Sequence, residues 1–370
     1  ERSWAEAPMQ YRLVPRNTQP RTLVLAAPLL AIAATLVCGL LAASLAGIGA
    51  SAVLEAFFVA PVSDHYGVGE LLIKAAPLAL IALGLSIGFR ANVWNIGAEG
   101  QLVLGAIVAS GLALFSPWLG VFLLPAMLLT GALGGAAWSA FPAWLRARFG
   151  ASEILVSLML NYVALLLLSY LVHGPWRDPA GYNFPESALF PSHATMPVLL
   201  SDTRLHLGIL IAALALVGAW VIGARTYLGF QMLVAGVSPG AAGYAGVSPR
   251  RVIWVGLLTG GAAAGLAGAG EVAGPIGQLL PTVSPGYGYA AIVVAFIGRL
   301  HPVGIGLASL LIAWLYLGSE TAQVRLSVPS SFTALAQGLL LFFLLAADLF
   351  THFRLEPSGP ASATKRAASR

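Results

Sequence analysis

The sequence predicts an all-α integral membrane protein with about ten transmembrane helices and with both termini on the cytoplasmic side. Hydrophobic residues make up 58% of the chain and charged residues only 9%, with a mean hydropathy of +0.86. A soluble domain carries about 25% charged residues. The apolar residues gather into runs of about 20, the length that crosses a bilayer as a helix. Basic residues concentrate in alternate connections between these runs, which predicts the orientation.

The apolar runs divide the chain into three regions. Residues 1–21 form a polar N-terminal segment, residues 22–350 a transmembrane domain, and residues 351–370 a cytoplasmic tail that we expect to be disordered. The first run is much longer than a signal-peptide core of about 7 to 15 residues, so it is predicted to be an uncleaved span. The predicted spans are residues 22–49, 70–89, 98–116, 118–141, 152–172, 205–223, 250–270, 287–298, 302–320 and 331–350.

The distribution of charge agrees with this topology. When the N-terminus is placed inside, most of the 19 lysines and arginines fall in cytoplasmic segments. Only Lys74, Arg177, Arg204 and Arg325 fall outside or at the outer interface, as the positive-inside rule requires. The pI of about 9.6 follows from this asymmetry and from the basic tail, and no nucleic-acid partner is predicted.

Several kinds of chemistry lack the residues that they require. Cys38 is the only cysteine and the six histidines never recur at metal-ligand spacing, so neither an intrachain disulfide nor a metal site is predicted. No Ser/His/Asp set or pair of carboxylates points to a membrane enzyme. Neither lysine, Lys74 or Lys365, follows a Gly-x-x-x-x-Gly run, so the chain has no phosphate-binding loop and is expected to hold no cofactor.

Residues 89–101 form a polar island between two apolar runs. The island contains Arg90, Asn92, Asn95 and Glu99 where the hydrocarbon region should begin. A charge at the centre of a membrane helix costs about 2.5 to 3.5 kcal/mol on insertion scales, so these groups are expected to face protein or a water-filled cavity. The island is therefore the first candidate for a functional site.

A second interruption lies in the other half of the chain, over residues 271–288. Its prolines and glycines cannot continue a helix. Spans two to five and seven to ten face opposite ways, and each half is interrupted after its first span, which is the pattern of an inverted repeat with a translocation site at the breaks. We expect a re-entrant or broken element lined by Gln278, Thr282, Ser284 and Tyr287, with an ordinary outer loop as the alternative.

A short helix is predicted between spans six and seven. Ser238-Pro239 starts it through a side-chain cap and a proline at the first helical position, and Gly246 stops it. Ser248-Pro249 repeats the start signal for the next span. The short helix either docks into a groove of another subunit or is a simple connector.

The outer connection of residues 173–204 is also long enough to have a function. It predicts either an ordered surface loop that receives a partner protein or a solvated connector.

Glycines at helical spacing occur in pairs in two spans, at Gly131 and Gly135 in one, and at Gly256 and Gly260 and at Gly261 and Gly265 in the other. We expect these pairs to be seams where helices pack closely.

Three polar motifs lie in a fixed order along the chain, namely Phe89–Gln101, Ser152–Tyr162 and Gly246–Val252. Together they resemble the permease family of bacterial ABC importers for nucleosides and simple sugars, and the similarity runs from about residue 70 to 350. The chain is most similar to the guanosine and purine-nucleoside branch. The resemblance implies a type II importer-like permease fold in a bacterial inner, or cytoplasmic, membrane.

The resemblance also implies three partners. They are a cytoplasmic ABC ATPase with two nucleotide-binding domains that binds ATP and Mg, a second homologous permease, and an extracytoplasmic substrate-binding lipoprotein. This chain is then a transport subunit and not an enzyme. Residues 231–247 correspond to the coupling segment that contacts the ATPase. Gly240 and Gly243 stand where relatives usually carry charged residues, which puts a salt bridge at that contact in doubt. The implied coupling residues are Ser238, Pro239, Ala241, Ala242, Tyr244, Ala245 and Gly246.

A nucleoside is a neutral, flat base on a hydroxyl-rich sugar, so its path needs amides and hydroxyls for hydrogen bonds and aromatic rings for stacking. The predicted substrate-pathway residues are Asn92, Trp94, Asn95, Glu99, Gln101, Asn161, Tyr162, Gln278, Thr282, Ser284 and Tyr287. Asn95→Leu should then reduce uptake while folding stays intact.

Other roles remain open for four of these residues. Glu99 is alternatively a cap for a broken helix, and Asn92 and Asn95 alternatively satisfy unwound backbone. Asn161 is alternatively a polar bridge between helices.

Two further functions stay open at this point. The first is a permease for ribose or another simple sugar, which the same polar groups would serve. The second is an ion-coupled secondary transporter, which requires acids within the membrane. Only Glu99 is a clear candidate for such an acid.

Overall fold

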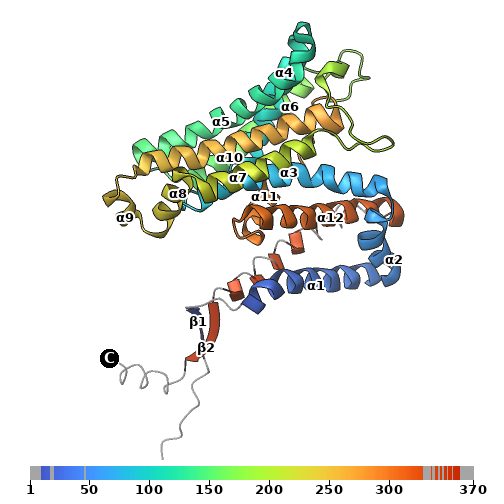
Figure 1. Ribbon diagram of the computed structural model, residues 1–370. Coiled ribbons are helices and arrows are strands. Elements are labelled where there is room, and N and C mark those ends of the chain that lie inside the picture. Colours follow the sequence, from blue (N-terminus) through green and yellow to red (C-terminus); the bar gives the residue numbers. More distant parts are fainter. Residues whose placement is uncertain are drawn as a thin grey trace, which may run out of the picture. The chain divides into compact units, whose positions relative to one another are not determined.

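The computed structural model describes residues 10–16, 21–45, 47–327 and 353–358, and part of the chain between 335 and 351 (Figure 1). The residues described in that last part are 335, 338–340, 342–343, 346–347 and 349–351. The chain separates into two units, one formed by residues 56–321 and the other by residues 1–55 with 322–370.

The smaller unit contains α1 (Arg21–Leu45), α2 (Ala50–Leu54) and a two-stranded antiparallel sheet. In the sheet, β1 (Gln10–Pro15) pairs with β2 (Phe353–Ser358). The prediction of a disordered tail over residues 351–370 is therefore wrong for residues 353–358. Apolar and polar residues alternate at the start of both strands, a period-2 pattern that the Ser/Ala/Pro-rich composition further along the tail concealed.

Seven helices in the described part of the chain are long and apolar enough to cross a membrane, which confirms an integral, multi-pass membrane protein. The predicted count of ten, the inverted repeat and the orientation stay predictions, and the span expected over residues 331–350 lies largely outside the described residues. The seven long helices are α3 (His65–Phe89), α4 (Ala98–Phe115), α5 (Leu123–Phe149), α6 (Glu153–His173), α7 (Gly208–Arg225), α10 (Pro249–Glu271) and α12 (Pro302–Leu326). Short 3₁₀ turns cover Ala60–Val62, Pro117–Phe122 and Ser192–Ala194, and π-helical turns cover Glu55–Val59 and Val272–Ile276.

Helix α10 is the centre of the larger unit and packs against α3, α4 and α5 (Figure 1). Its Gly261 and Gly265 lie directly against Gly131 and Gly135 of α5, where any added Cβ would collide with the opposing backbone. The predicted packing seam at these glycines is thus confirmed. Close approach of small residues replaces the hydrophobic driving force that lipid does not supply.

Both predicted interruptions break helices. The first separates α3 from α4 over residues 90–97, and the second follows α10 and leads through residues 277–286 to α11 (Tyr287–Ile297). An 11-residue helix is about 16 Å long, whereas the hydrocarbon region is about 30 Å thick. The span predicted over residues 287–298 is therefore only a half-helix.

Helices α8 (Tyr227–Val237) and α9 (Pro239–Tyr244) follow α7 at one end of the bundle (Figure 1). The Ser238 hydroxyl accepts a hydrogen bond from the Ala241 N–H at 3.4 Å, and Gly246 adopts a left-handed φ of 78°. These observations confirm the predicted start and stop of the short helix, because a proline at the first helical position and a glycine after the last are the favoured boundaries.

The connection of residues 174–207 joins α6 to α7 at the opposite end of the bundle and folds over the second break (Figure 1). The Ser187 N–H donates to the Leu279 carbonyl at 3.1 Å. The Phe190 N–H donates to the Gly277 carbonyl at 2.9 Å. The loop is thus ordered, and its reception of a partner stays a prediction.

Candidate functional site

A reciprocal pair of buried amides holds the first break open. Asn95 Nδ2 donates to Gln101 Oε1 at 2.8 Å, and Gln101 Nε2 donates to Asn95 Oδ1 at 2.9 Å. Asn95 Oδ1 also accepts from the Gly97 N–H at 3.0 Å. Both amide side chains are 1% exposed. In this conformation the two amides satisfy each other and the unwound backbone, as membrane depth requires.

Asn161 of α6 joins this break to α11. Its Oδ1 accepts from the Gly100 N–H at 2.9 Å, and its Nδ2 donates to the Ile96 carbonyl and to the Tyr289 hydroxyl, both at 3.0 Å. The side chain is completely buried. Asn161 therefore has the geometry of a polar bridge between helices.

Glu99 ties the two breaks together. Its carboxylate accepts from the Gly288 N–H at 2.7 Å, and hydrogen bonds with the Ser284 hydroxyl and the Gly286 N–H add to this contact. A Cβ at Gly288 would collide with the Glu99 backbone, so the starts of α4 and α11 touch. Two positive helix ends thus converge on one buried carboxylate, the favourable placement for an anion.

Trp94 forms the aromatic edge of the first break. Its ring stacks on Phe296, with centroids 5.5 Å apart, and makes a tilted contact with Phe89, with centroids 5.3 Å apart. The backbone N–H of Trp94 donates to Glu153 Oε1 at 3.2 Å, and Glu153 forms an ion pair with Arg146. The Trp94 ring is therefore held by aromatic neighbours on α3 and α11.

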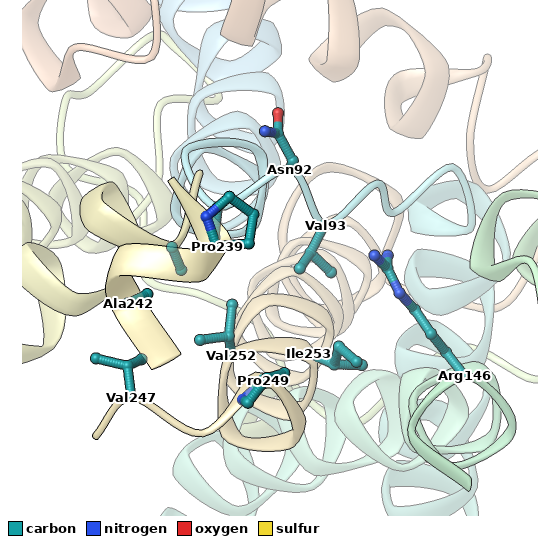
Figure 2. Close-up of a pocket in the computed structure, with 11 residues that line it drawn as sticks. Asn92, Val93, Arg146, Pro239, Ala242, Val247, Pro249, Val252 and Ile253 are labelled. Atoms are coloured by element: carbon teal, nitrogen blue, oxygen red, sulfur yellow. The ribbon is translucent and has the colours of Figure 1, made fainter. Parts of the chain in front are cut away.

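A pocket of about 190 Å³ separates this break from α9 (Figure 2). Figure 2 shows Asn92 and Val93 on one side, Ala242 and Val247 on another, and Arg146 across from them. The lining residues are Ala91, Asn92, Val93, Arg146, Ala235, Pro239, Ala242, Val247, Pro249, Val252 and Ile253. Asn92 Nδ2 donates to the Gly236 carbonyl at 2.9 Å, which joins the break to the end of α8.

The segment around α9 presents a largely solvent-exposed surface. Of the predicted coupling residues, Ala242 is buried against the pocket. The others are exposed, and they are Ser238, Pro239, Ala241, Tyr244, Ala245 and Gly246. Tyr244 is 97% exposed, so a large aromatic side chain projects from a helix anchored at one alanine. A surface of this kind is suited to contact with another protein.

Comparison with known proteins places this architecture in a family. Residues 67–346 match the family of permease components of the branched-chain amino acid transport system. The match covers more than half of the chain. The chain belongs to this family of membrane permeases.

Individual relatives agree with this assignment. A glucose ABC transporter permease of Haloferax volcanii is 36% identical over 94% of both chains. A guanosine ABC transporter permease of Bacillus subtilis is 33% identical over 86% of this chain and 92% of its own length. A nucleoside ABC transporter permease of Lactococcus lactis is 28% identical over 78% of this chain and 82% of its own length. No solved structure matches the permease. The predicted similarity to ABC transporter permeases is thus confirmed.

Four predicted pathway residues of the permease lie outside the network of Glu99, Asn95 and Asn161. Tyr162 is 59% exposed on the outer face of α6, because it follows the buried Asn161 by one position on the helix. Thr282 is exposed, and Gln278 donates to Glu186 Oε2 at 3.0 Å in the loop of residues 174–207. Tyr287 is buried beside Tyr316, with ring centroids 6.0 Å apart.

Sequence reasoning missed four residues of the permease that hold the network in place. These are Arg146, Glu153, Tyr289 and Phe296. Arg146 and Glu153 are the one pair that carried a signal, an arginine in the last turn of one apolar helix and an acid in the first turn of the next. The aromatic residues carried none, since aromatic residues are common in membrane helices.

The opposite end of the permease holds a second ion pair. Arg204 donates twice to the Glu70 carboxylate, at 2.8 and 2.7 Å, and these hydrogen bonds raise the pKa of Arg204 above its usual value. His206 is 6% exposed, and burial lowers its pKa. Its Nδ1 accepts from the Gly208 N–H at 3.1 Å, and its ring packs on Gly274 beside the second break.

Metal ligands do not gather anywhere in the described residues. No group of three or more His, Cys, Asp and Glu side chains there is arranged to hold a metal ion.

Proposed function

We propose that this permease is the membrane-spanning subunit of an ATP-driven importer for a neutral, hydroxyl-rich solute, either a simple sugar or a nucleoside. The names of the relatives support both solute classes, because they are permeases for glucose, for guanosine and for nucleosides. Both classes carry several sugar hydroxyls. The chain has no phosphate-binding loop, so ATP and Mg are bound by a separate cytoplasmic ATPase with two nucleotide-binding domains.

One observation carries the proposal: the first helix break contacts both the end of α8, which leads directly into α9, and the turn that follows α11. Asn92 donates to the Gly236 carbonyl, and a Cβ at Gly236 would collide with the Arg90 carbonyl. Arg90 in turn donates to the Leu300 carbonyl, between α11 and α12, at 2.5 Å. A displacement of α9 by the ATPase is therefore transmitted to the ends of α3 and α11.

The second step of the proposed mechanism is movement of the two breaks as one body. Glu99 holds the start of α11, and Asn161 holds both the first break and α11 to α6. The start of α4 and α11 therefore do not shift independently. Alternating access by joint movement of broken helices around a central site is the pattern of membrane transporters. Solute passes when this body tilts relative to α10.

The proposal includes two further partners and a location. A second homologous permease completes the membrane assembly, and an extracytoplasmic lipoprotein delivers solute to the ordered loop of residues 174–207. The assembly resides in the inner membrane. The exposed Tyr182 and Leu189 of the loop, at 94% and 75%, supply apolar contact area for the delivery protein.

Site-directed cross-linking tests the coupling contact. Tyr244→Cys is introduced into a Cys38→Ser background, which removes the only native cysteine. We expect a short bifunctional reagent to join this position to the ATPase. Tyr182→Cys, equally exposed at the opposite end of the bundle, is the matched control and should give no such product. A cross-link from Tyr182→Cys and none from Tyr244→Cys would contradict the proposal.

Transport assays separate this function from an ion-coupled transporter. In the structure Glu99 is occupied by the Gly288 N–H and the start of α11, which supports a positioning role over an ion site. ATP-dependent uptake of glucose, ribose or guanosine by the assembled transporter is expected. Uptake driven by a proton or sodium gradient in vesicles without any ATPase subunit would favour the ion-coupled alternative.

A further inference from the structure

A line of polar side chains runs down one face of α3 from the loop end of the bundle. Tyr66, Glu70 and Lys74 follow each other at four-residue spacing, which places them on one side of the helix. Glu70 is held by Arg204 of the outer loop. The line therefore begins at the loop that faces the delivery side of the proposed importer.

Lys74 carries this line into the membrane. It is the tenth residue of α3, about 13 Å from the helix start at the usual rise per residue. Its Nζ donates to Glu320 Oε1 of α12 at 2.8 Å, and it interacts electrostatically with Glu271 of α10. Its side chain is only 15% exposed. Three ionisable side chains from α3, α10 and α12 thus gather in a protein that spans the membrane, where ionisable residues mark functional sites by default.

Two tyrosines close the lower side of this cluster. Tyr287 and Tyr316 make an edge-on ring contact, and Tyr287 interacts electrostatically with Glu271 and Glu320. Tyr287 is the first residue of the half-helix α11. The cluster therefore lies at the start of α11.

The cluster is continuous with the network at the first break. Tyr287 directly precedes Gly288, whose N–H donates to Glu99 at 2.7 Å. Glu99 lies in the first turn of α4, and the next residue, Gly100, donates its N–H to Asn161 of α6. The cluster is thus joined to the buried polar groups of the first break.

We propose that a polar stripe formed by Glu70, Lys74, Glu271, Tyr287, Tyr316 and Glu320 binds the sugar ring of the transported solute. This inference rests on the proposed function and names the side chains that recognise its substrate. Carboxylates accept from sugar hydroxyls, the ammonium donates to them, and tyrosine rings cover the apolar face of the ring. Free sugars and the ribosyl group of nucleosides share this chemistry.

The charges of the polar stripe also exclude a class of solutes. Lys74 is already paired with Glu320, and Arg204 beside the stripe is already paired with Glu70, so an anionic solute gains little from either cation. Sugar phosphates are therefore expected neither to be carried nor to compete with the neutral sugar.

The decisive experiment compares single and paired charge removal in the assembled transporter. Uptake of radiolabelled glucose, ribose and guanosine is measured with the wild type, with Glu320→Gln, and with Lys74→Met/Glu320→Met. The double variant removes both members of the Lys74–Glu320 ion pair, so neither is left without the other, and a purely structural pair would be dispensable in it. A binding role predicts that both variants lower the uptake rate at sub-saturating solute by about tenfold or more, as lost binding contacts do.

A matched control is available in a different ion pair of α12. Arg325 lies 3.9 Å from Glu55, and both side chains are more than half exposed. Arg325→Met should leave uptake within about twofold of the wild type, because exposed pairs contribute little. Deoxy sugars provide a readout that a structural defect would not move. Glu320→Gln should slow uptake of a deoxy sugar less than uptake of the parent sugar. The deoxy sugar lacks the hydroxyl that Glu320 contacts, so it has no such contact to lose.

The outcomes separate the two levels of the inference. If the wild type takes up none of the three solutes in the presence of ATP, the proposed function is overturned, and the binding site with it. If the wild type transports solute and Lys74→Met/Glu320→Met transports it at the same rate, the binding site alone is overturned. Equal slowing of parent and deoxy sugars by Glu320→Gln also overturns it. Loss of glucose and ribose uptake with guanosine uptake unchanged restricts the site to free sugars, which contradicts recognition of the ribosyl group. Assembled protein is quantified for each variant, and Glu320→Gln provides the readout if the double variant does not assemble.

Discussion

Asn95 and Gln101 are amides at membrane depth, and each supplies both the donor and the acceptor that the other needs. Such a pair is stable as long as both members are present. Loss of one member leaves a buried polar group unsatisfied, which costs about 1–3 kcal/mol, whereas replacement of both by apolar groups is nearly neutral. The two residues are therefore coupled energetically.

Asn95→Leu is expected to lower the unfolding free energy by about 1–3 kcal/mol, because it strands the Gln101 amide and the Gly97 N–H. The sequence alone predicts lost uptake with intact folding, and the reciprocal pairing adds this stability cost. Asn95→Leu/Gln101→Leu should recover most of the stability. Thermal unfolding of the purified permease measures both, and equal destabilisation by the single and double variants would refute the coupling.

Half-helix α11 depends on a carboxylate outside it. Glu99 supplies an acceptor and a negative charge to the N-terminus of α11, an interaction worth up to about 2 kcal/mol when partly buried. Glu99→Gln is expected to expose the Gly288 amide to faster hydrogen exchange. Glu186→Gln, in the outer loop, should leave that amide protected. Unchanged protection of Gly288 in Glu99→Gln would show that the carboxylate does not hold this helix.

The junction of α8 with α9 transmits movement through backbone contact. Gly236→Ala forces a Cβ into the Arg90 carbonyl, so it should lower solute uptake while ATP hydrolysis by the assembled transporter continues. Gly240→Ala is the matched control, since nothing lies within 4 Å of the position and alanine favours a helix by about 1 kcal/mol. Transport and ATPase rates measured together decide the matter, and proportional loss of both would argue against an uncoupling effect.

The outer loop confers a pH dependence through His206. Burial lowers its pKa below the ordinary value of 6.5, so the folded protein binds fewer protons than the unfolded chain. The stability is therefore complete above about pH 6.5 and decreases as the pH falls through and below that value. Thermal unfolding at about pH 7.5 and about pH 5.5 should show a larger difference for the wild type than for His206→Asn. If the wild type and His206→Asn show the same difference in thermal unfolding between the two pH values, His206 is excluded as the source of the pH dependence.

At the scale of the whole molecule, the proposed division of labour assigns ATP binding to another subunit, since this sequence contains no phosphate-binding loop. We expect the purified permease to hydrolyse no ATP, and hydrolysis to appear when the ATPase subunit is added and to rise with solute-loaded delivery protein. A steady-state phosphate-release assay measures this. Hydrolysis by a preparation of the permease alone, purified to homogeneity, would contradict the division of labour.

Composition and spacing were sufficient to predict a multi-pass membrane protein, both helix breaks, and the start and stop of α9. These features depend on local signals such as Ser238-Pro239 and Gly246. Spacing could not tell which face of α6 is buried, and so Tyr162 was grouped with Asn161 although only Asn161 points inward. Contacts between distant segments, such as Glu99 with Gly288, arise only from tertiary packing.

The half-length of α11 has a consequence for biosynthesis. A segment of 11 residues is too short for the insertion machinery to treat as a span. The irregular backbone of residues 277–286 has unsatisfied polar groups in lipid, so it needs protein around it before it can enter the membrane. Residues 272–297 are therefore expected to enter the membrane only after α3 and α4, which contact α11, are in place. The part of the chain that the proposed transport cycle moves is thus built after the helices that it contacts.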